Sequence, residues 1–210
     1  QKKLKKLFFT STSEIYSGSF KNKLIKFPTK ENSILSLNEM NSARGTYMLS
    51  KIYCEALCHF SNIPFIILRP HNIFGERMGM SHVIPELIKK IHKSKKNLEL
   101  NNSSHKRSFC YIGDAVNMMI LLMKNSKAIN KTYNLGDPNN EISILDLAKK
   151  LIKFSKINKK ILKINKENFS VQRRLPDIKK LLKDTGFKNK SNFEDNLKKT
   201  YDWYEKNLSI

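Results

Sequence analysis

A tyrosine and a lysine, Tyr47 and Lys51, stand four positions apart in the stretch RGTYMLSKIYCEAL, residues 44–57. Apolar residues recur with helical spacing across residues 42–61, so both side chains are expected on one helix face, one turn apart. A phenol is a poor base at neutral pH because its ordinary pKa is about 10, and a nearby ammonium lowers that value. Such a pair can deprotonate an alcohol while a hydride leaves the alcohol carbon.

A hydroxyl group at a strand end would complete this arrangement. Residues 4–12, LKKLFFTST, are typical of a short buried strand, and Thr12 or Ser13 at its carboxyl end would orient the substrate alcohol. A Y-x-x-x-K pair alone is common by chance, so the spacing by itself also fits an ordinary helix.

The elements that position these residues alternate between strand and helix. IPFIILRP, residues 63–70, is an apolar run that predicts a buried parallel strand. Strand, helix and strand form one βαβ unit, which predicts an α/β fold. Residues 17–38 are expected to form an irregular surface loop. Further helices are predicted at 81–93, 113–126, 143–155, 178–187 and 193–208, and short strands at 98–100, 107–112 and 132–136. Predicted helix caps are Asp114, Ser143 and Gly186.

Lysine and arginine outnumber aspartate and glutamate by 40 to 18, which gives a net charge of +22. Such a balance usually indicates a nucleic-acid partner. Lysine is spread along the whole chain, however, and neither a basic-aromatic platform nor a helix-turn-helix pattern stands out. We expect no nucleic-acid partner and a positive field that favours phosphates. A non-catalytic anion- or nucleic-acid-binding domain is the alternative of another class.

The sequence contains no run of about 18 apolar residues and no signal peptide, so no membrane partner is expected. Cys54, Cys58 and Cys110 do not form a disulfide framework, which fits a reducing cytoplasm. Cys54 and Cys58 beside His59 would suit a metal, but small buried thiols are commoner on a helix, so no metal is expected. The chain begins at Gln1 and enters a strand almost at once, so we expect a fragment of a larger protein.

Several stretches together carry a family resemblance, in their order and spacing. They resemble the extended short-chain dehydrogenase/reductase family, specifically the NAD-dependent nucleotide-sugar epimerases and dehydratases. The resemblance covers nearly the whole chain. The stretches are FFTSTSEIY (8–16), YMLSK (47–51), ILRPHNIFG (67–75), HVIPELI (82–88), RSFCYIGDAV (107–116), YNLGD (133–137), RRLPDIKKLLKDTGF (173–187) and TYDWY (200–204).

The resemblance implies the later part of a doubly wound Rossmann-like parallel sheet plus a small α/β C-terminal substrate domain. It assigns residues 1–80 to a partial dinucleotide-binding portion. Residues 81–210 are assigned mostly to nucleotide-sugar binding, with 107–126 returning to the Rossmann portion. The family's glycine-rich loop has no counterpart among the 7 glycines of this chain. We therefore expect an absent N-terminal half, and a homodimer for the full-length protein.

By the same resemblance, Tyr47 is the catalytic base, Lys51 is its partner and Thr12 is the catalytic hydroxyl residue. Tyr47 and Lys51 also contact the cofactor NAD, Lys51 at the nicotinamide ribose. Glu14 is expected to act as an acid or base near the sugar C5–C6, or else to pack at the strand end. Ser17 stands where the family usually has glycine.

The resemblance also implies substrate-binding residues: Ser13, Asn72, Arg107 and Arg174. Asn72 would contact the phosphates, and the two arginines would bind the pyrophosphate, because a guanidinium donates two parallel hydrogen bonds. The structural alternatives are a surface position for Arg107, a backbone contact for Asn72 and a solvated Arg173–Arg174 pair. Ser108 and Gly113 stand where the family usually has acidic residues.

The implied reaction begins with NAD⁺ oxidising the sugar C4 alcohol to a 4-keto nucleotide sugar, with a UDP-linked substrate expected. A 4-epimerase is favoured, in which the ketone turns over and the hydride returns. The alternatives within the family are a nucleotide-glucuronate decarboxylase and a 4,6-dehydratase, both of which need a further group such as Glu14.

Overall fold

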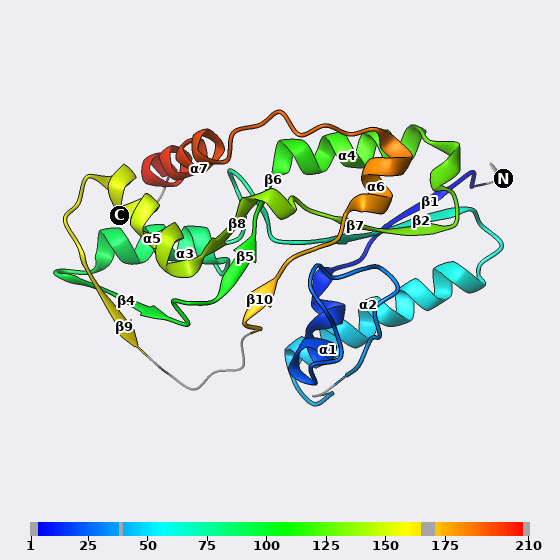
Figure 1. Cartoon of the computed structure of the whole chain (residues 1–210), viewed down its shortest axis with the longest axis horizontal. Coiled ribbons are helices and arrows are strands. Elements are labelled where there is room, and N and C mark those ends of the chain that lie inside the picture. Colours follow the sequence, from blue (N-terminus) through cyan, green and yellow to red (C-terminus); the bar gives the residue numbers. More distant parts are fainter. Residues whose placement is uncertain (1–3, 38–39, 165–170, 208–210) are drawn as a thin grey trace.

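The computed structural model describes residues 4–37, 40–164 and 171–207, so residue 38 of the predicted loop and residue 208 of the predicted last helix lie outside it. A parallel sheet in the order β1-β2-β7 lies in one half of the molecule (Figure 1). Its strands are β1 (Leu7–Thr10), β2 (Phe65–Pro70) and β7 (Lys131–Leu135). Helix α2 (Ala43–Phe60) connects β1 to β2, which confirms the predicted βαβ unit.

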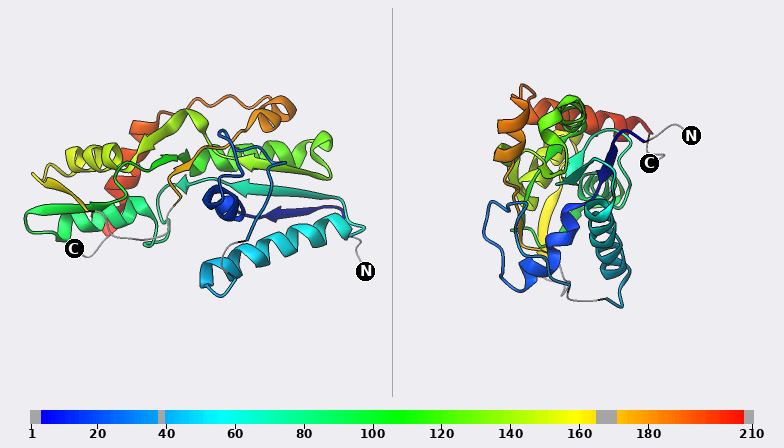
Figure 2. Two further views of the ribbon diagram at one scale, coloured as in Figure 1. Left: turned by 60° about the horizontal axis from the view of Figure 1, so that its bottom comes forward. Right: turned by 90° about the vertical axis from the view of Figure 1, so that its right-hand side faces the viewer.

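Helices cover both faces of this sheet. Successive side chains of a strand point to opposite faces, so Ile67 packs with Cys58 of α2 on one side. Its neighbours Ile66 and Leu68 pack on the other side, against α4 and α6. Figure 2 shows α2 on one face and α4 with α6 on the other. The bounds of these two helices are Ile112–Lys124 and Lys179–Thr185.

The other half of the molecule contains short strands and longer helices (Figure 1). Strand β4 pairs with β9, β3 pairs with β6, and a mixed sheet has the order β10-β5-β8. The strands are β3 (Ile73–Phe74), β4 (Asn97–Asn101), β5 (Lys106–Ser108), β6 (Cys110–Tyr111), β8 (Glu141–Ser143), β9 (Lys160–Ile164) and β10 (Arg173–Arg174). The helices are α3 (Val83–Lys93), α5 (Ile144–Ser155) and α7 (Phe193–Asn207). Short 3-10 turns occur at η1 (Ser13–Tyr16), η2 (Ser126–Ala128) and η3 (Pro138–Asn140).

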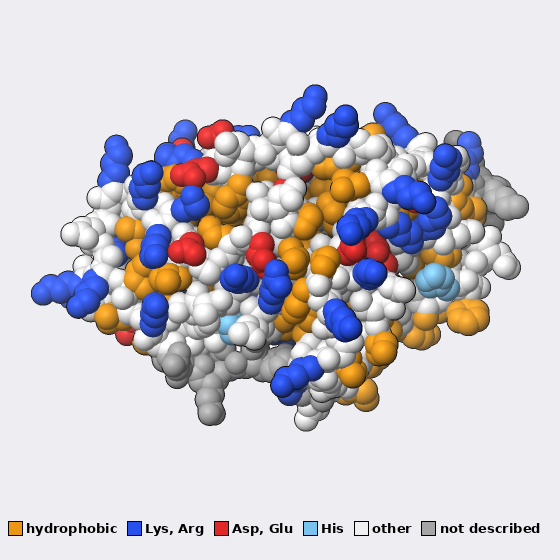
Figure 3. Space-filling model, in the orientation of Figure 1, with side chains coloured by type: hydrophobic (Ala, Val, Ile, Leu, Met, Phe, Trp, Pro, Cys, Tyr) orange, Lys and Arg blue, Asp and Glu red, His pale blue; other side chains and the backbone are white. Residues whose placement is uncertain are grey.

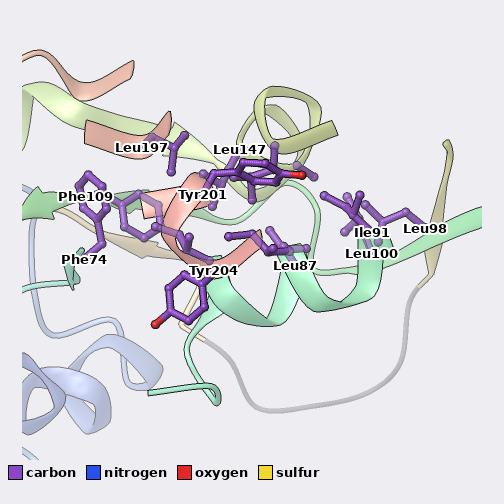
Figure 4. Packing of buried hydrophobic residues seen from close by; sticks show 14 residues of the cluster. Phe74, Leu87, Ile91, Leu98, Leu100, Phe109, Leu147, Leu197, Tyr201 and Tyr204 are labelled. Carbon is purple, nitrogen blue, oxygen red and sulfur yellow. The ribbon is translucent and has the colours of Figure 1, made fainter. Parts of the chain in front are cut away.

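A hydrophobic core holds α3, α5 and α7 together (Figure 4). Ile91 of α3, Leu147 of α5 and Tyr201 of α7 are each completely buried in it. Removing a large apolar side chain from water stabilises a fold by about 2 kcal/mol. The apolar side chains of these three helices therefore form the hydrophobic core of this half of the molecule.

Two of the predicted caps are confirmed. Ser143 Oγ accepts a hydrogen bond of 3.0 Å from the Asp146 amide at the start of α5. Gly186 ends α6 with a φ of 65°, a left-handed conformation that glycine adopts at no steric cost. The third prediction is wrong, because α4 begins at Ile112 and Asp114 lies inside its first turn. Asp114 is buried there and accepts a hydrogen bond from Ser191.

The predicted irregular loop contains a helix, α1 (Ser17–Lys21), at its start. The Thr12 side chain caps η1, and α1 continues directly from that turn. Ser19 of α1 is fully buried and donates a hydrogen bond of 2.6 Å to the Ile34 carbonyl. The tertiary contact with the returning chain stabilises a helix that has no apolar periodicity of its own.

Lysine and arginine side chains are scattered over the whole face of the molecule in Figure 3, among a few acidic ones. This distribution matches the spread of lysine along the sequence. Among the helices of the described residues, none has the length and apolar character needed to cross a bilayer.

Candidate active site

Tyr47 and Lys51 lie on α2 beside the carboxyl end of β1. Lys51 Nζ donates a hydrogen bond of 2.9 Å to the Thr10 carbonyl. The same nitrogen lies 5.9 Å from the centre of the Tyr47 ring and 5.1 Å from that of Phe9. Tyr47 is 44% exposed. Lys51 thus holds α2 against the strand end and keeps its ammonium beside the tyrosine ring.

The chain turns sharply after β1, and this turn carries Thr12, Ser13 and Glu14. Thr12 Oγ1 accepts a hydrogen bond of 3.2 Å from the Glu14 amide and so begins the turn η1. Thr12 follows the carbonyl that holds Lys51 by two residues. Ser13, the first residue of this turn, is buried. The end of β1 therefore brings the predicted hydroxyl residue to the same strand end as the lysine.

Glu14 lies between two arginines from distant parts of the chain. Its Oε2 accepts hydrogen bonds of 2.9 and 2.7 Å from Arg44, and its Oε1 accepts one from Arg174. Ser17 Oγ donates a further bond of 3.0 Å. Burial alone would raise the pKa of Glu14, but Arg174 and Arg44 lower it to about 2. Glu14 is therefore a carboxylate at neutral pH.

Arg173 and Arg174 have different surroundings, although they are neighbours on β10. Arg173 forms two hydrogen bonds with Glu141, of 2.6 and 2.8 Å, and lies over the Phe27 ring. Arg174 is 7% exposed and faces Glu14. Its Nε has no hydrogen-bond partner within the part of the chain that the structure describes. The two arginines therefore do not form one solvated pair, because Arg173 binds Glu141 and Arg174 binds Glu14.

A cavity of about 950 Å³ extends from Glu14 toward α3 and β4. Asn72, Arg107 and Arg174 all line it, together with Arg44. Asn72 also donates a hydrogen bond of 3.1 Å to the Ser108 carbonyl. The cavity thus brings together residues that are far apart in the sequence.

The cavity has an excess of positive charge at this end. Burial and the adjacent Arg174 lower the pKa of Arg107 to about 10. Arg44, Arg107 and Arg174 carry three positive charges, and Glu14 carries one negative charge. An anionic ligand between Arg107 and Arg174 would relieve the repulsion between the two guanidinium groups. This arrangement suits a phosphate or pyrophosphate group.

Thr12, Tyr47 and Lys51 are not among the described residues that line this cavity. They lie next to it, because Glu14 follows Thr12 by two positions and Arg44 precedes Tyr47 by three. The predicted site residues therefore form two adjacent groups, one at the end of β1 and one inside the cavity.

Sequence reasoning missed Arg44. It precedes Tyr47 by three helix positions, which places residues on the same helix face, so its spacing was a usable signal. Its partner Glu14 lies 30 residues away in sequence and has no such signal.

The sequence model of the family described as "NAD dependent epimerase/dehydratase family" matches residues 1–136. A dTDP-D-glucose 4,6-dehydratase of Dictyostelium discoideum is 31% identical over 73% of this chain and 36% of that protein. A UDP-N-acetyl-alpha-D-glucosaminuronate decarboxylase of Bacillus cytotoxicus is 27% identical over 95% of this chain and 64% of that protein. The chain thus spans less than two thirds of each of these relatives.

Solved structures share the fold. A UDP-glucuronic acid 4-epimerase from Bacillus cereus, in complex with UDP-glucuronic acid and NAD, superposes with a TM-score of 0.81 at 24% identity, covering 97% of this chain and 62% of that one. A UDP-glucose 4-epimerase from Thermotoga maritima has a TM-score of 0.79 at 22% identity, covering 97% of this chain and 64% of that one.

Proposed function

The chain belongs to the NAD-dependent epimerase/dehydratase family, and on that premise we propose that it carries the proton-transfer and substrate-binding residues of an NAD-dependent enzyme that oxidises the C4 alcohol of a nucleotide sugar. The observation that carries the proposal is the position of the Lys51 ammonium. It lies beside the Tyr47 ring and binds the carbonyl of Thr10, which stands two residues before Thr12 at the end of β1.

Three residues have roles in the proposed first step. Tyr47, as phenolate, accepts the proton of the C4 hydroxyl. Thr12 orients that hydroxyl, and the Lys51 ammonium balances the phenolate charge. NAD⁺, when bound, supplies the acceptor for the hydride that leaves C4. The products of this step are a 4-keto nucleotide sugar, protonated Tyr47 and NADH.

The residues of this chain fit one end of the cofactor. Tyr47 and Lys51 lie at the carboxyl end of parallel strands, where the nicotinamide half of a dinucleotide binds in doubly wound sheets. The pyrophosphate needs a glycine-rich turn, and the 7 glycines of this chain include no G-x-x-G-x-x-G. We propose that this turn belongs to a segment preceding the present chain.

The cavity supports a nucleotide sugar as the substrate class. Arg107 and Arg174 would bind the pyrophosphate and Asn72 a phosphate oxygen, and the whole cavity of about 950 Å³ has room for a nucleotide sugar. We propose a UDP-linked sugar, as bound by the two epimerases of similar fold.

We propose 4-epimerisation as the outcome after the ketone forms. Return of the hydride to the opposite face of C4 requires only the residues already assigned, because protonated Tyr47 gives its proton back to the C4 oxygen. A 4,6-dehydratase needs a proton donor for the leaving hydroxyl, and Glu14, ionised by Arg44 and Arg174, is poorly suited to donate one.

Decarboxylation of a nucleotide uronate is the second candidate, and a specific observation favours it. Arg44 and Arg174 both pair with Glu14, so two positive charges surround one negative charge. A sugar carboxylate placed there would be stabilised, and a 4-ketone two carbons away from that carboxylate promotes loss of carbon dioxide.

A product assay separates these outcomes. The protein as its gene encodes it is incubated with NAD⁺ and UDP-glucose, UDP-glucuronate or dTDP-glucose, and the products are identified by NMR. Epimerisation gives a C4 epimer of unchanged mass, decarboxylation releases carbon dioxide, and dehydration gives a 4-keto-6-deoxy sugar. Failure to turn over any of the three would contradict the proposed function.

We also propose that the full-length protein is a homodimer that associates through α2. Leu49, Tyr53, Leu57 and Phe60 form an exposed apolar stripe along this helix, with Phe60 90% exposed. Sedimentation of the wild-type protein and of a Leu57→Glu variant tests this association.

A further inference from the structure

A buried arginine on β2 links several elements that carry the candidate site. Arg69 is 6% exposed and donates hydrogen bonds of 3.0 and 2.6 Å to the carboxylate of Glu55 on α2. Its NH1 group donates bonds of 2.7 Å to the Tyr16 hydroxyl and to the Glu31 carbonyl. One guanidinium therefore connects α2, the turn after β1 and the returning loop.

The Tyr16 hydroxyl extends this network to β7. It donates a hydrogen bond of 3.0 Å to Asn134 Oδ1, and Tyr16 itself is completely buried. The Asn134 side-chain amide donates bonds of 2.9 and 3.3 Å to the carbonyls of Thr29 and Asp177. The Tyr16 hydroxyl thus joins Arg69 to the segment that follows β10.

Each end of the network lies a few residues from a candidate site residue. Glu55 follows Lys51 by one helical turn and Tyr47 by two. Tyr16 follows Glu14 by two residues, and Asp177 follows Arg174 by three. The elements that carry these four site residues are therefore tied to one hydrogen-bonded cluster beneath the site.

We propose that Arg69 and Tyr16 are positioning residues, which set the distance between the Tyr47–Lys51 face of α2 and the turn that carries Thr12 and Glu14. This inference rests on the proposed function, because the effect of the distance appears as a rate of proton transfer. Neither side chain lines the cavity in the described part of the chain, and the Tyr16 hydroxyl and the Arg69 guanidinium are already hydrogen-bonded to other protein groups. A displacement of about 1 Å in a catalytic group costs up to about a hundredfold in rate.

The purely structural alternative is that the network only stabilises the fold. Removing Arg69 would leave Glu55 as an unpaired buried charge and risks unfolding the chain. Tyr16→Phe is the sharper test, because it removes only the hydroxyl that joins Arg69 to Asn134 and leaves the Arg69–Glu55 pair intact.

The chain contains a matched control. Tyr133 on β7 is also completely buried, and its hydroxyl donates one hydrogen bond of 2.6 Å to Asp184 on α6. Tyr133→Phe removes the hydroxyl of another buried tyrosine, on the α4–α6 side of the sheet, and this hydroxyl takes no part in the Arg69–Tyr16–Asn134 network. Both variants are expected to lower the urea midpoint to a similar extent.

The first measurement is steady-state kinetics of the protein as its gene encodes it, with NAD⁺ and the best of UDP-glucose, UDP-glucuronate and dTDP-glucose. We expect Tyr16→Phe to lower kcat by about tenfold with KM changed less than twofold, and Tyr133→Phe to leave both constants near wild type. Equal kcat values for both variants would overturn the proposal.

The second measurement is amide hydrogen exchange, which needs no substrate. We expect Tyr16→Phe to accelerate exchange in peptides that cover residues 12–21 and 43–52, and Tyr133→Phe to leave these peptides unchanged. If the wild-type protein turns over none of the sugars, the proposed function fails, and hydrogen exchange alone decides whether the network positions these segments. Unchanged exchange in Tyr16→Phe would overturn the inference whatever the activity.

Discussion

Arg174 donates a hydrogen bond to the carboxylate of Glu14, a residue 160 positions earlier in the sequence. The same arginine lies 3.4 Å from Ser17 Oγ, so it contacts both the turn after β1 and the helix that follows it. This contact joins β10 to the segment that carries Thr12. The candidate site is therefore assembled from both ends of the chain.

Replacing Arg174 with methionine should weaken UDP binding by at least tenfold, because Arg174 is a buried cavity residue with an unused Nε donor in the described structure. Arg173→Met is the matched control, since Arg173 pairs with Glu141 outside the cavity. Isothermal titration calorimetry with UDP measures both. An equal loss of UDP affinity in the two variants would contradict the proposal that Arg174 binds the substrate.

The ion pairs of Glu14 should make stability depend on pH. Because a pKa unit is worth about 1.4 kcal/mol, lowering the pKa of Glu14 from 4.5 to about 2 stabilises the folded chain by roughly 3 kcal/mol. This contribution is fully present above pH 4.5 and is lost as the pH falls from 4.5 to about 2. Urea unfolding of wild type and Glu14→Gln should show a difference at pH 7 that shrinks steadily below pH 4.5. If the difference in unfolding free energy between the two proteins did not change with pH, the charge of the Glu14 carboxylate would contribute nothing to stability.

Tyr47→Phe should lower kcat by about a hundredfold or more, because it removes the group that accepts the C4 hydroxyl proton. Tyr53 lies on the same helix and is 62% exposed, so Tyr53→Phe should leave kcat within twofold of wild type. Both are measured with the nucleotide sugar that the product assay identifies. Near-normal turnover by Tyr47→Phe would refute the proposed mechanism.

Gly18 should resist substitution. A Cβ at this position would lie 1.7 Å from the Ser36 carbonyl oxygen, where the returning loop crosses α1. Gly18→Ala should therefore destabilise the chain by about 2 kcal/mol, as other overpacked sites do. Gly79→Ala is the control, because its nearest neighbour, a carbon of His82, lies at an ordinary contact distance of 3.4 Å. An equal decrease of the urea midpoint in Gly18→Ala and Gly79→Ala would show that the Ser36 carbonyl does not lie against Gly18.

The long helices were predictable from the sequence because their signals are local. The apolar spacing of residues 42–61 predicted a helix that the structure places at Ala43–Phe60. The Ser143 cap involves Asp146, three residues away, and the Gly186 cap involves Leu182, four residues away, whose carbonyl accepts a hydrogen bond of 2.9 Å from the Gly186 amide. Interactions that span one helical turn leave a periodic pattern that can be read without knowing the fold.

The helix α1 and the start of α4 were not predictable in this way. Ser17–Lys21 is helical because Ser19 is buried against Ile34, and Asp114 is inside α4 rather than at its cap. In both cases a tertiary contact outweighs a weak local preference.

The sequence by itself determined the α/β class, the helix that carries Tyr47 and Lys51, and the strand that ends beside Thr12, because these depend on periodicity and on spacing within one turn. Only the tertiary structure decided that Arg173 pairs with Glu141 and that Arg44 and Arg174 share Glu14. The two bonds to Glu14 span 30 and 160 residues. Such pairings depend on how the chain crosses itself, which no local pattern encodes.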